Sequence, residues 1–185
     1  MKLVKKLLAV IVVIIAIIIG VYAYFGGFSK LNFKVANEGG ETIVYREMIG
    51  DYGKSGDLMK AVNDELVNDY DMIINQNIGI YYDNPDEVVE DKMRSDIGCI
   101  VNTDDVNKLS ELSKSFLVKK CPKQEYLSVK LPFKGFFSIM IGIFRVYPAM
   151  DDYLDDKGYD DEGPIMEIYD LKNKTITYRK AITKE

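Results

Sequence analysis

The chain opens with a continuous apolar segment. Residues 7–25 contain no charged side chain, and Leu7 to Ile19 is apolar at every position. A helix of about 19 residues is about 28 Å long, close to the hydrocarbon thickness of a bilayer. The pattern predicts a transmembrane helix: residues 1–28 comprise cytoplasmic lysines and the anchor, and residues 7–25 contact the lipid bilayer.

Lysines flank this segment unequally. Lys2, Lys5 and Lys6 precede it, whereas only Lys30 and Lys34 follow closely. The positive-inside tendency therefore predicts a single-pass protein with its amino terminus in the cytoplasm and its domain outside.

A cleaved signal peptide is the alternative, because Val21-Tyr22-Ala23 offers small residues at the spacing that signal peptidase accepts. The apolar run is long for the hydrophobic region of a signal peptide, which favours an uncleaved anchor.

Beyond a short linker at residues 29–40, periodicity changes from strand to helix and back. Leu58, Val62, Leu66 and Tyr70 recur every four residues, which predicts a helix that Asp57 caps. Strands are predicted around it at 42–49, 77–83 and 95–101. The connection 103–120 has room for a short helix.

The same order of elements then repeats. We expect a strand at 125–133, a helix from Gly135 to about Leu154, and strands at 165–171 and 175–181. Two strand-helix-strand-strand units predict an α+β fold, in which an antiparallel sheet carries both helices on one face. Residues 41–185 form this one domain.

The domain that follows the anchor is acidic. Residues 1–30 hold four lysines and no acid, so the rest of the chain has a net charge of −9. Nucleic-acid affinity comes largely from Lys and Arg that neutralise phosphates. We therefore expect no nucleic-acid partner, and a field that favours cationic over anionic ligands.

The composition also restricts catalysis and metal binding. The chain has no histidine, which excludes Ser-His-Asp and Cys-His catalysis and His-ligated zinc. Cys99 and Cys121 lack CxxC spacing, although a disulfide between them stays open if the domain is outside the cytoplasm. The acids between Asp151 and Glu162 do not follow the calcium-loop pattern. We expect no metal and no cofactor.

Three short segments resemble a known family. Tyr81-Tyr82-Asp83-Asn84-Pro85, followed by Asp91-Lys92-Met93-Arg94 and Asp96-Ile97-Gly98, is similar to the central signature of GyrI-like small-molecule-binding domains. The resemblance implies the duplicated fold predicted above and a small-molecule ligand.

A second resemblance is to animal receptors for autophagy of the endoplasmic reticulum, which join one membrane span to a GyrI-like domain. It is carried by Arg145-Val146-Tyr147-Pro148-Ala149-Met150, Pro164 and Glu167-Ile168-Tyr169. It implies a membrane adaptor with a protein partner as an alternative function. The lysines before the anchor predict the opposite topology, which favours a bacterial envelope over the endoplasmic reticulum.

Candidate ligand-binding residues follow from strand alternation and the resemblance. Glu167 and Tyr169 have the parity of Ile165, so all three point to one face of the sheet. In GyrI-like domains a glutamate at this position can lie in the ligand pocket, where its carboxylate attracts cations or, if neutral, donates a hydrogen bond.

Neighbouring tyrosines complete the candidate set. Tyr81 and Tyr82 alternate, so one is expected in the core and the other at a cleft, and the sequence does not decide which. Tyr45 is the remaining member.

The leading prediction is a membrane-anchored GyrI-like domain that binds an apolar or cationic small molecule, or docks a partner, without catalysis. The resemblance also implies a second alternative, since some GyrI-like proteins hydrolyse reactive electrophiles with a Glu and Tyr pair. Glu167 with Tyr45, Tyr81 or Tyr169 is the candidate pair for that activity.

Overall fold

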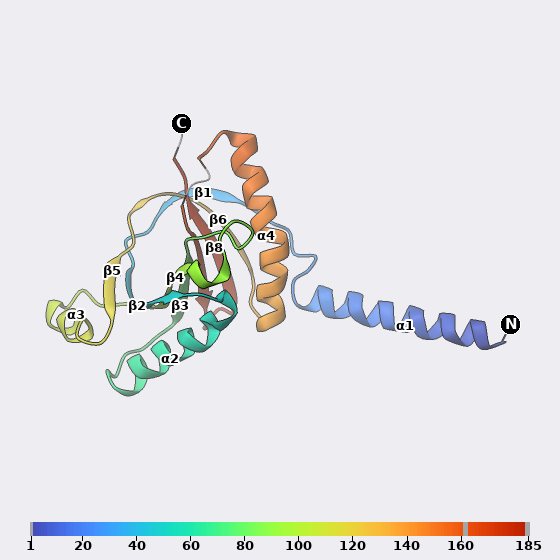
Figure 1. Ribbon diagram of the computed structural model, residues 1–185, viewed down its shortest axis with the longest axis horizontal. Coiled ribbons are helices and arrows are strands. Elements are labelled where there is room, and N and C mark those ends of the chain that lie inside the picture. Colours follow the sequence, from blue (N-terminus) through green and yellow to red (C-terminus); the bar gives the residue numbers. More distant parts are fainter. Residues whose placement is uncertain (1, 161–162, 184–185) are drawn as a thin grey trace.

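The computed structural model describes residues 2–160 and 163–183, which hold four α-helices and eight strands (Figure 1). Asp161 and Glu162, and the last two residues of the predicted domain 41–185, lie outside the described residues. The helices are α1 (Lys2–Tyr24), α2 (Ser55–Asn68), α3 (Val106–Leu112) and α4 (Phe136–Lys157). The strands are β1 (Lys34–Glu38), β2 (Thr42–Ile49), β3 (Gln76–Tyr81), β4 (Arg94–Val101), β5 (Leu117–Lys120), β6 (Gln124–Pro132), β7 (Ile165–Asp170) and β8 (Thr175–Ala181).

All eight strands form one antiparallel sheet in the order β1-β6-β8-β7-β3-β4-β2-β5. Units β2-α2-β3-β4 and β6-α4-β7-β8 are the two predicted repeats, and they join where β7 pairs with β3. The predicted α+β fold is confirmed. The join places Glu167 of β7 opposite Gly79 of β3 on one side and Tyr178 of β8 on the other.

Strand β1 corrects the predicted linker. Lys34–Glu38 pairs with β6, so most of the second half of segment 29–40 belongs to the sheet. β5 likewise adds an edge strand within the connection 103–120, after the predicted short helix, α3. Both additions are short edge strands, whose polar and charged residues carry little apolar alternation.

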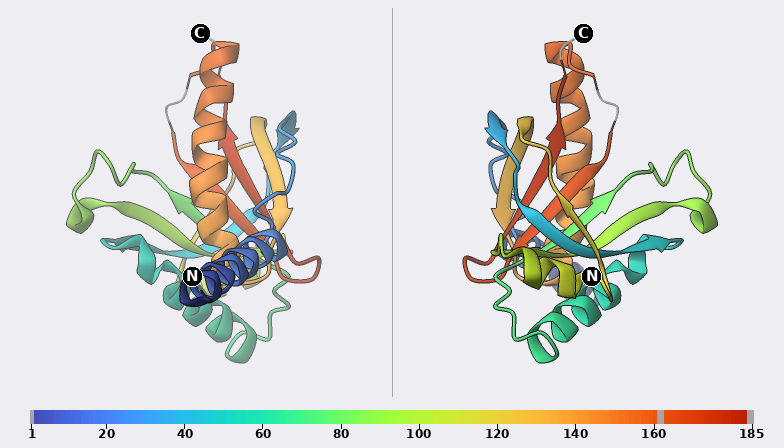
Figure 2. Two further views of the ribbon diagram at one scale, coloured as in Figure 1. Left: turned by 90° about the vertical axis from the view of Figure 1, so that its right-hand side faces the viewer. Right: turned by 90° about the vertical axis from the view of Figure 1, so that its left-hand side faces the viewer.

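Helices α2 and α4 cover the same face of the sheet, here called the helical face (Figure 2). Val146, Met150 and Leu154 of α4 join Met59 of α2 in one buried cluster with side chains of the sheet. The opposite face carries a second buried cluster that includes Ile43, Ile78, Ile80, Tyr126, Met166 and Ile168. Strand residues are therefore buried on both faces of the sheet.

Local chain features set the ends of α2 and α4. The backbone of Gly135 precedes α4 with a φ of 105°, and Gly158 ends it in the left-handed conformation with a φ of 65°, which favours glycine. Helix α2 begins at Ser55, so Asp57 lies in its first turn and does not cap it.

Helix α1 projects away from the domain (Figure 1). Its 23 residues are long and apolar enough to cross a membrane, and none of them is buried against the domain. The two cysteines are both buried and free, which makes the disulfide alternative wrong. Cys99 packs in a cluster beneath α2, and Cys121 packs with the cluster of the opposite face.

Candidate functional site

A buried carboxylate lies at the centre of the helical face. Glu167 of β7 is 2% exposed, and both of its oxygens accept hydrogen bonds from tyrosine hydroxyls. Tyr147 of α4 donates to Oε1 at 2.8 Å, and Tyr169, two residues along β7, donates to Oε2. Helix α4 and strand β7 thus meet at one acid.

The electrostatics of Glu167 are those of a buried acid without a cationic hydrogen-bond partner among the described residues. Burial raises the pKa of Glu167 above its ordinary value, and hydrogen bonds from Tyr169 and Tyr147 offset part of this rise. Burial, and then the nearby Glu167 carboxylate, raise the pKa of Tyr147 and Tyr169 well above the usual range. Both hydroxyls therefore keep their protons at neutral pH and serve as donors to the acid.

Two further tyrosines enclose the carboxylate. The Tyr81 hydroxyl donates to Ser55 Oγ at 3.1 Å, and the ring of Tyr52 packs edge-on against Tyr81 at 4.9 Å between centroids. Tyr178 is fully buried, and its hydroxyl has no hydrogen-bond partner among the described residues. Aromatic rings therefore surround the acid on several sides.

Two glycines provide the space for these rings. A Cβ on Gly79, opposite Glu167, would lie 2.8 Å from the Tyr81 ring. A Cβ on Gly142 of α4 would lie 1.7 Å from the Tyr178 hydroxyl oxygen. Both glycines are thus required by close approach of an aromatic side chain rather than by backbone conformation.

The structure divides the five predicted site residues between the two faces. Glu167, Tyr169 and Tyr81 lie together on the helical face. Tyr82 donates to Asp96 on the opposite face at 2.7 Å, so it is the more exposed member of its pair.

Tyr45 also lies on that opposite face. The amine of Lys119 is 4.5 Å from the centre of its ring, and the same amine pairs with Asp96. Tyr45 therefore does not contact Glu167, and this corrects its pairing with that acid in the predicted set.

The predicted set lacks two residues that the structure places at the acid, Tyr147 and Tyr178. Tyr147 directly follows Val146, a member of the buried ladder of α4 that repeats every four residues. Tyr178 has the parity of Ile176, a core residue of β8. Both signals are present in the sequence, but they indicate core packing and do not distinguish a site.

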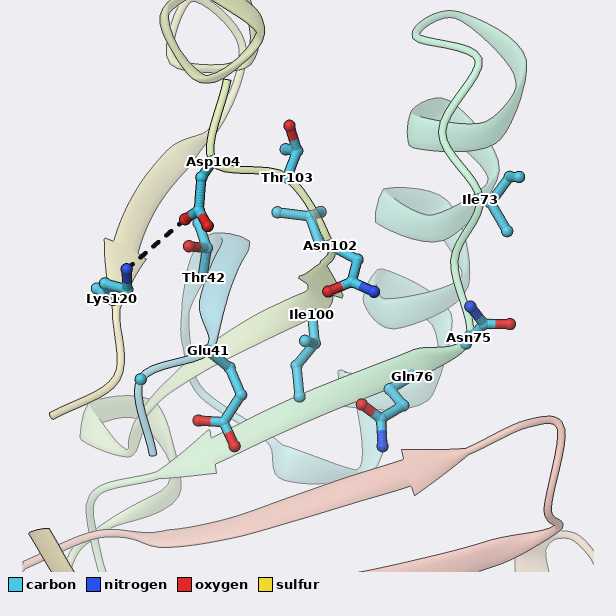
Figure 3. Close-up of a pocket in the computed structure, with 12 residues that line it drawn as sticks. Glu41, Thr42, Ile73, Asn75, Gln76, Ile100, Asn102, Thr103, Asp104 and Lys120 are labelled. Carbon is cyan, nitrogen blue, oxygen red and sulfur yellow. Dashed lines mark ion pairs between the residues drawn. The ribbon is translucent and has the colours of Figure 1, made fainter. Parts of the chain in front are cut away.

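A separate polar cavity of about 320 Å³ lies at the ends of β2, β3 and β4 (Figure 3). Its walls include Glu41, Asn75, Gln76, Asn102 and Thr103, and Lys120 pairs with Asp104 across one side at 3.6 Å. No predicted site residue lines it. The described residues contain no cluster of three or more His, Cys, Asp or Glu side chains placed to hold a metal ion.

Comparison with known proteins gives matches along most of the chain. Human testis-expressed protein 264 is 28% identical over 163 residues, which cover 78% of this chain and 48% of the human protein. The chain thus spans about half the length of the curated relatives it matches.

Solved structures share the fold at low identity. The C-terminal domain of EcmrR has a TM-score of 0.61 at 13% identity and covers 84% of this chain and 99% of its own. SAV2435, solved with bound tetraphenylphosphonium, has a TM-score of 0.57 at 11% identity and covers 82% of this chain and 94% of its own.

The family assignment rests on the sequence of the domain itself. Residues 40–183 match the family described as GyrI-like small molecule binding domain, and these residues include both repeats of the sheet and the acid Glu167. Domains of this kind bind small molecules. The chain belongs to the GyrI-like small-molecule-binding domain family.

Proposed function

We propose that this protein is a single-pass membrane protein whose GyrI-like domain captures an apolar organic cation at Glu167, without catalysing a reaction. One observation carries the proposal. Glu167 is buried, yet its hydrogen-bond partners in the described chain are tyrosine hydroxyls and not a Lys or Arg. A buried carboxylate without a cation is destabilising, and a ligand cation would supply the missing charge.

The surroundings of the acid define the class of ligand. The rings of Tyr147, Tyr169, Tyr81 and Tyr178 gather around the acid, and aromatic rings attract cations and pack against apolar groups. The acidic domain adds a field that draws cations towards it. A lipophilic cation with delocalised charge suits the buried carboxylate, the aromatic rings and the acidic field alike. SAV2435, which shares the fold, is bound to such a cation, tetraphenylphosphonium.

Access to the acid requires a change in the structure, because Glu167 is 2% exposed and Tyr169 is 5% exposed. Tyr147 is the side chain of α4 that closes over the acid. Pro148 follows it and cannot donate the backbone hydrogen bond that the preceding turn of the helix would accept. We propose that α4 moves at this point to admit the ligand.

The test is binding of tetraphenylphosphonium to the full chain in phosphatidylcholine nanodiscs, measured by isothermal titration calorimetry. We expect Glu167→Gln to weaken binding by at least about tenfold, which corresponds to about 1.4 kcal/mol. Gln keeps the size and hydrogen-bonding capacity of the side chain and removes only its charge.

Glu125→Gln is the matched control, because Glu125 is an exposed glutamate of β6, a strand that does not pair with β7. We expect it to bind as the unmodified chain does. Equal binding by Glu167→Gln and the unmodified chain would refute the proposal, since uptake of the cation would then not depend on the charge of Glu167.

Hydrolysis of electrophiles is the second candidate, and one observation favours it. A carboxylate and a phenol lie within hydrogen-bond distance at Glu167 and Tyr169, one of the predicted pairs, and also at Glu167 and Tyr147. In such a pair the carboxylate takes a proton from water as the water oxygen attacks an epoxide carbon, and the phenol protonates the oxygen of the opening ring. Styrene oxide is a suitable probe. Formation of the diol by the unmodified chain, lost in Glu167→Gln, would establish hydrolysis and overturn the non-catalytic proposal.

A further inference from the structure

The end of α1 and the residues after it are fixed to the start of α4 and the residues before it. The Lys134 amine donates to the Tyr24 carbonyl at 2.8 Å and lies 4.1 Å from the centre of the Tyr24 ring. The Arg145 guanidinium donates to the carbonyls of Gly26 and Ser29 at 3.1 and 2.9 Å. These contacts hold the direction in which α1 leaves the domain.

The two helices run across each other. In Figure 1, α1 extends sideways from the N-terminal end of α4, and α4 runs upward. The left view of Figure 2 looks from the side towards which α1 projects, and α4 runs across that view behind α1. A membrane spanned by α1 therefore lies along α4 and does not meet the domain at a loop tip.

The side of α4 beside α1 is apolar. We define the α4 patch as Phe136, Phe137, Met140, Ile141 and Phe144. Three of its side chains are largely exposed: Phe136 by 68%, Phe137 by 58% and Phe144 by 73%. Residues 137, 140, 141 and 144 have the spacing of one helix face, opposite the buried ladder. Exposed aromatic side chains at this density indicate a contact surface.

The α4 patch and the anchor share one groove. An apolar cavity of about 390 Å³ is lined by Ile17, Ile18 and Val21 of α1 and by members of the α4 patch, including Phe144. Ile17 precedes the last residue of α1 by seven positions, so it lies about 10 Å inside the end of the helix. If α1 spans the membrane, this groove therefore lies at the same depth as apolar side chains of the anchor, within the hydrocarbon region of the bilayer.

Exposed acidic residues mark the end of the apolar surface along α4. The exposed acids of the second half of α4 are Asp151, Asp152, Asp155 and Asp156. Carboxylates stay in water beside a bilayer, whereas Phe, Met and Ile enter the interface. The apolar stretch, Phe136 to Phe144, is about 13 Å long, so only the first half of α4 meets lipid.

We propose that the α4 patch lies in the bilayer leaflet nearest the domain, as a second membrane contact beside the anchor. The proposal rests on the anchor of the proposed function and extends it. Tyr147 follows the patch on the same helix, so the side chain that closes over Glu167 lies next to the membrane surface. An apolar cation dissolved in the leaflet then reaches the acid without crossing bulk water.

The chain has no tryptophan, so a single Trp reports one position. Phe144→Trp, Ile14→Trp in α1 and Val106→Trp on α3 are placed in the full chain and reconstituted in phosphatidylcholine vesicles with and without brominated acyl chains. We expect the brominated lipid to remove about half or more of the fluorescence of Phe144→Trp and of Ile14→Trp, because both lie in lipid. Val106→Trp, which replaces a side chain that is 77% exposed, keeps its fluorescence.

The outcomes separate the two proposals. Quenching of Ile14→Trp alone overturns the membrane contact of the α4 patch and leaves the anchor in place. A Phe144→Trp emission that is blue-shifted but not quenched would mean that protein, and not lipid, covers the α4 patch. If neither is quenched, the anchor and the contact of the patch are both overturned. Binding of tetraphenylphosphonium through Glu167 is read separately, by the variants described above.

Discussion

The two faces of the sheet each bury a charge, and they treat it differently. On the helical face, Glu167 of β7 has tyrosine hydroxyls as partners. On the opposite face, Arg179 of β8 is also 2% exposed, but its guanidinium binds Glu41 at 2.8 Å and lies 4.7 Å from the centre of the Tyr126 ring. The two charges occur on neighbouring strands, since Arg179 pairs with Met166, the residue before Glu167.

This difference separates a structural charge from a site. Burial raises the pKa of Glu41, but the hydrogen bond from Arg179, a backbone hydrogen bond and the charge of Arg179 together outweigh burial, so the net pKa is lowered. The pKa of Glu167 is raised, because the hydrogen bonds that it accepts do not offset its burial. The fold itself neutralises Arg179, whereas it leaves Glu167 to be neutralised by a proton or a ligand.

The largest effect is expected from breaking the neutralised pair. Glu41→Ala removes the carboxylate that binds Arg179 and leaves the buried guanidinium with Glu38, at 3.8 Å, as its one acidic partner among the described residues. Loss of one partner of a buried pair destabilises by about 3 to 5 kcal/mol, and we expect the lower end because Glu38 remains. Urea denaturation of the full chain in detergent micelles measures this loss.

The double variant Glu41→Ala with Arg179→Met sharpens the comparison. Met fills similar space without charge beside Met166 and Tyr126, so most of the lost stability returns if the loss comes from the uncompensated charge. A double variant as unstable as Glu41→Ala would show that packing, and not charge, holds this face.

The second effect tests how tightly the helical face is packed around the acid. Gly142→Ala places a Cβ 1.7 Å from the Tyr178 hydroxyl and 2.4 Å from its ring carbon, so α4 or Tyr178 must move. We expect a loss of about 1 to 3 kcal/mol, as for other overpacked cores. Thermal unfolding monitored by circular dichroism measures it.

Gly56→Ala in α2 is the matched control, because a Cβ there meets nothing within 4 Å. Ala favours helix over Gly by up to about 1 kcal/mol, so the control is stabilised or unchanged. Destabilisation of both variants by the same amount would refute the close contact between Gly142 and Tyr178.

The sequence predicts this fold well because its signals are local. The ladder of α4 and the alternation of β7 and β8 are visible in the residues, and the short turn between Asp170 and Thr175 sets the register that brings Tyr178 beside Glu167. The sequence pattern does not predict the edge strands β1 and β5, because their stability comes from pairing with β6 and β2 and not from apolar residues of their own.

The site is predicted less completely. Parity correctly places Glu167 and Tyr169 on one face, but it does not decide between Tyr81 and Tyr82 and assigns no face to Tyr45, since the direction of a strand relative to the helices is a tertiary property. Tyr147 reaches the acid only because α4 packs across β7, a contact between residues twenty positions apart with no local signal.

The smallest expected effect is a difference between Glu167 and Glu41 in how their contribution to stability changes with pH. Because the pKa of Glu167 is raised on folding, the folded state holds its proton above the unfolded pKa of 4.5, and stability contributed by that proton falls as pH rises through the raised value. Glu167→Gln abolishes this loss, so its unfolding free energy should match that of the unmodified chain below pH 4.5 and exceed it at neutral pH, by about 1 kcal/mol.

For Glu41, whose pKa is lowered, the sign reverses: its contribution is present above pH 4.5 and is lost as pH falls, so the destabilisation by Glu41→Gln should shrink in acid. Urea denaturation of both variants between pH 3.5 and pH 8 tests the comparison, since parallel profiles would mean that the fold does not treat Glu167 and Glu41 differently.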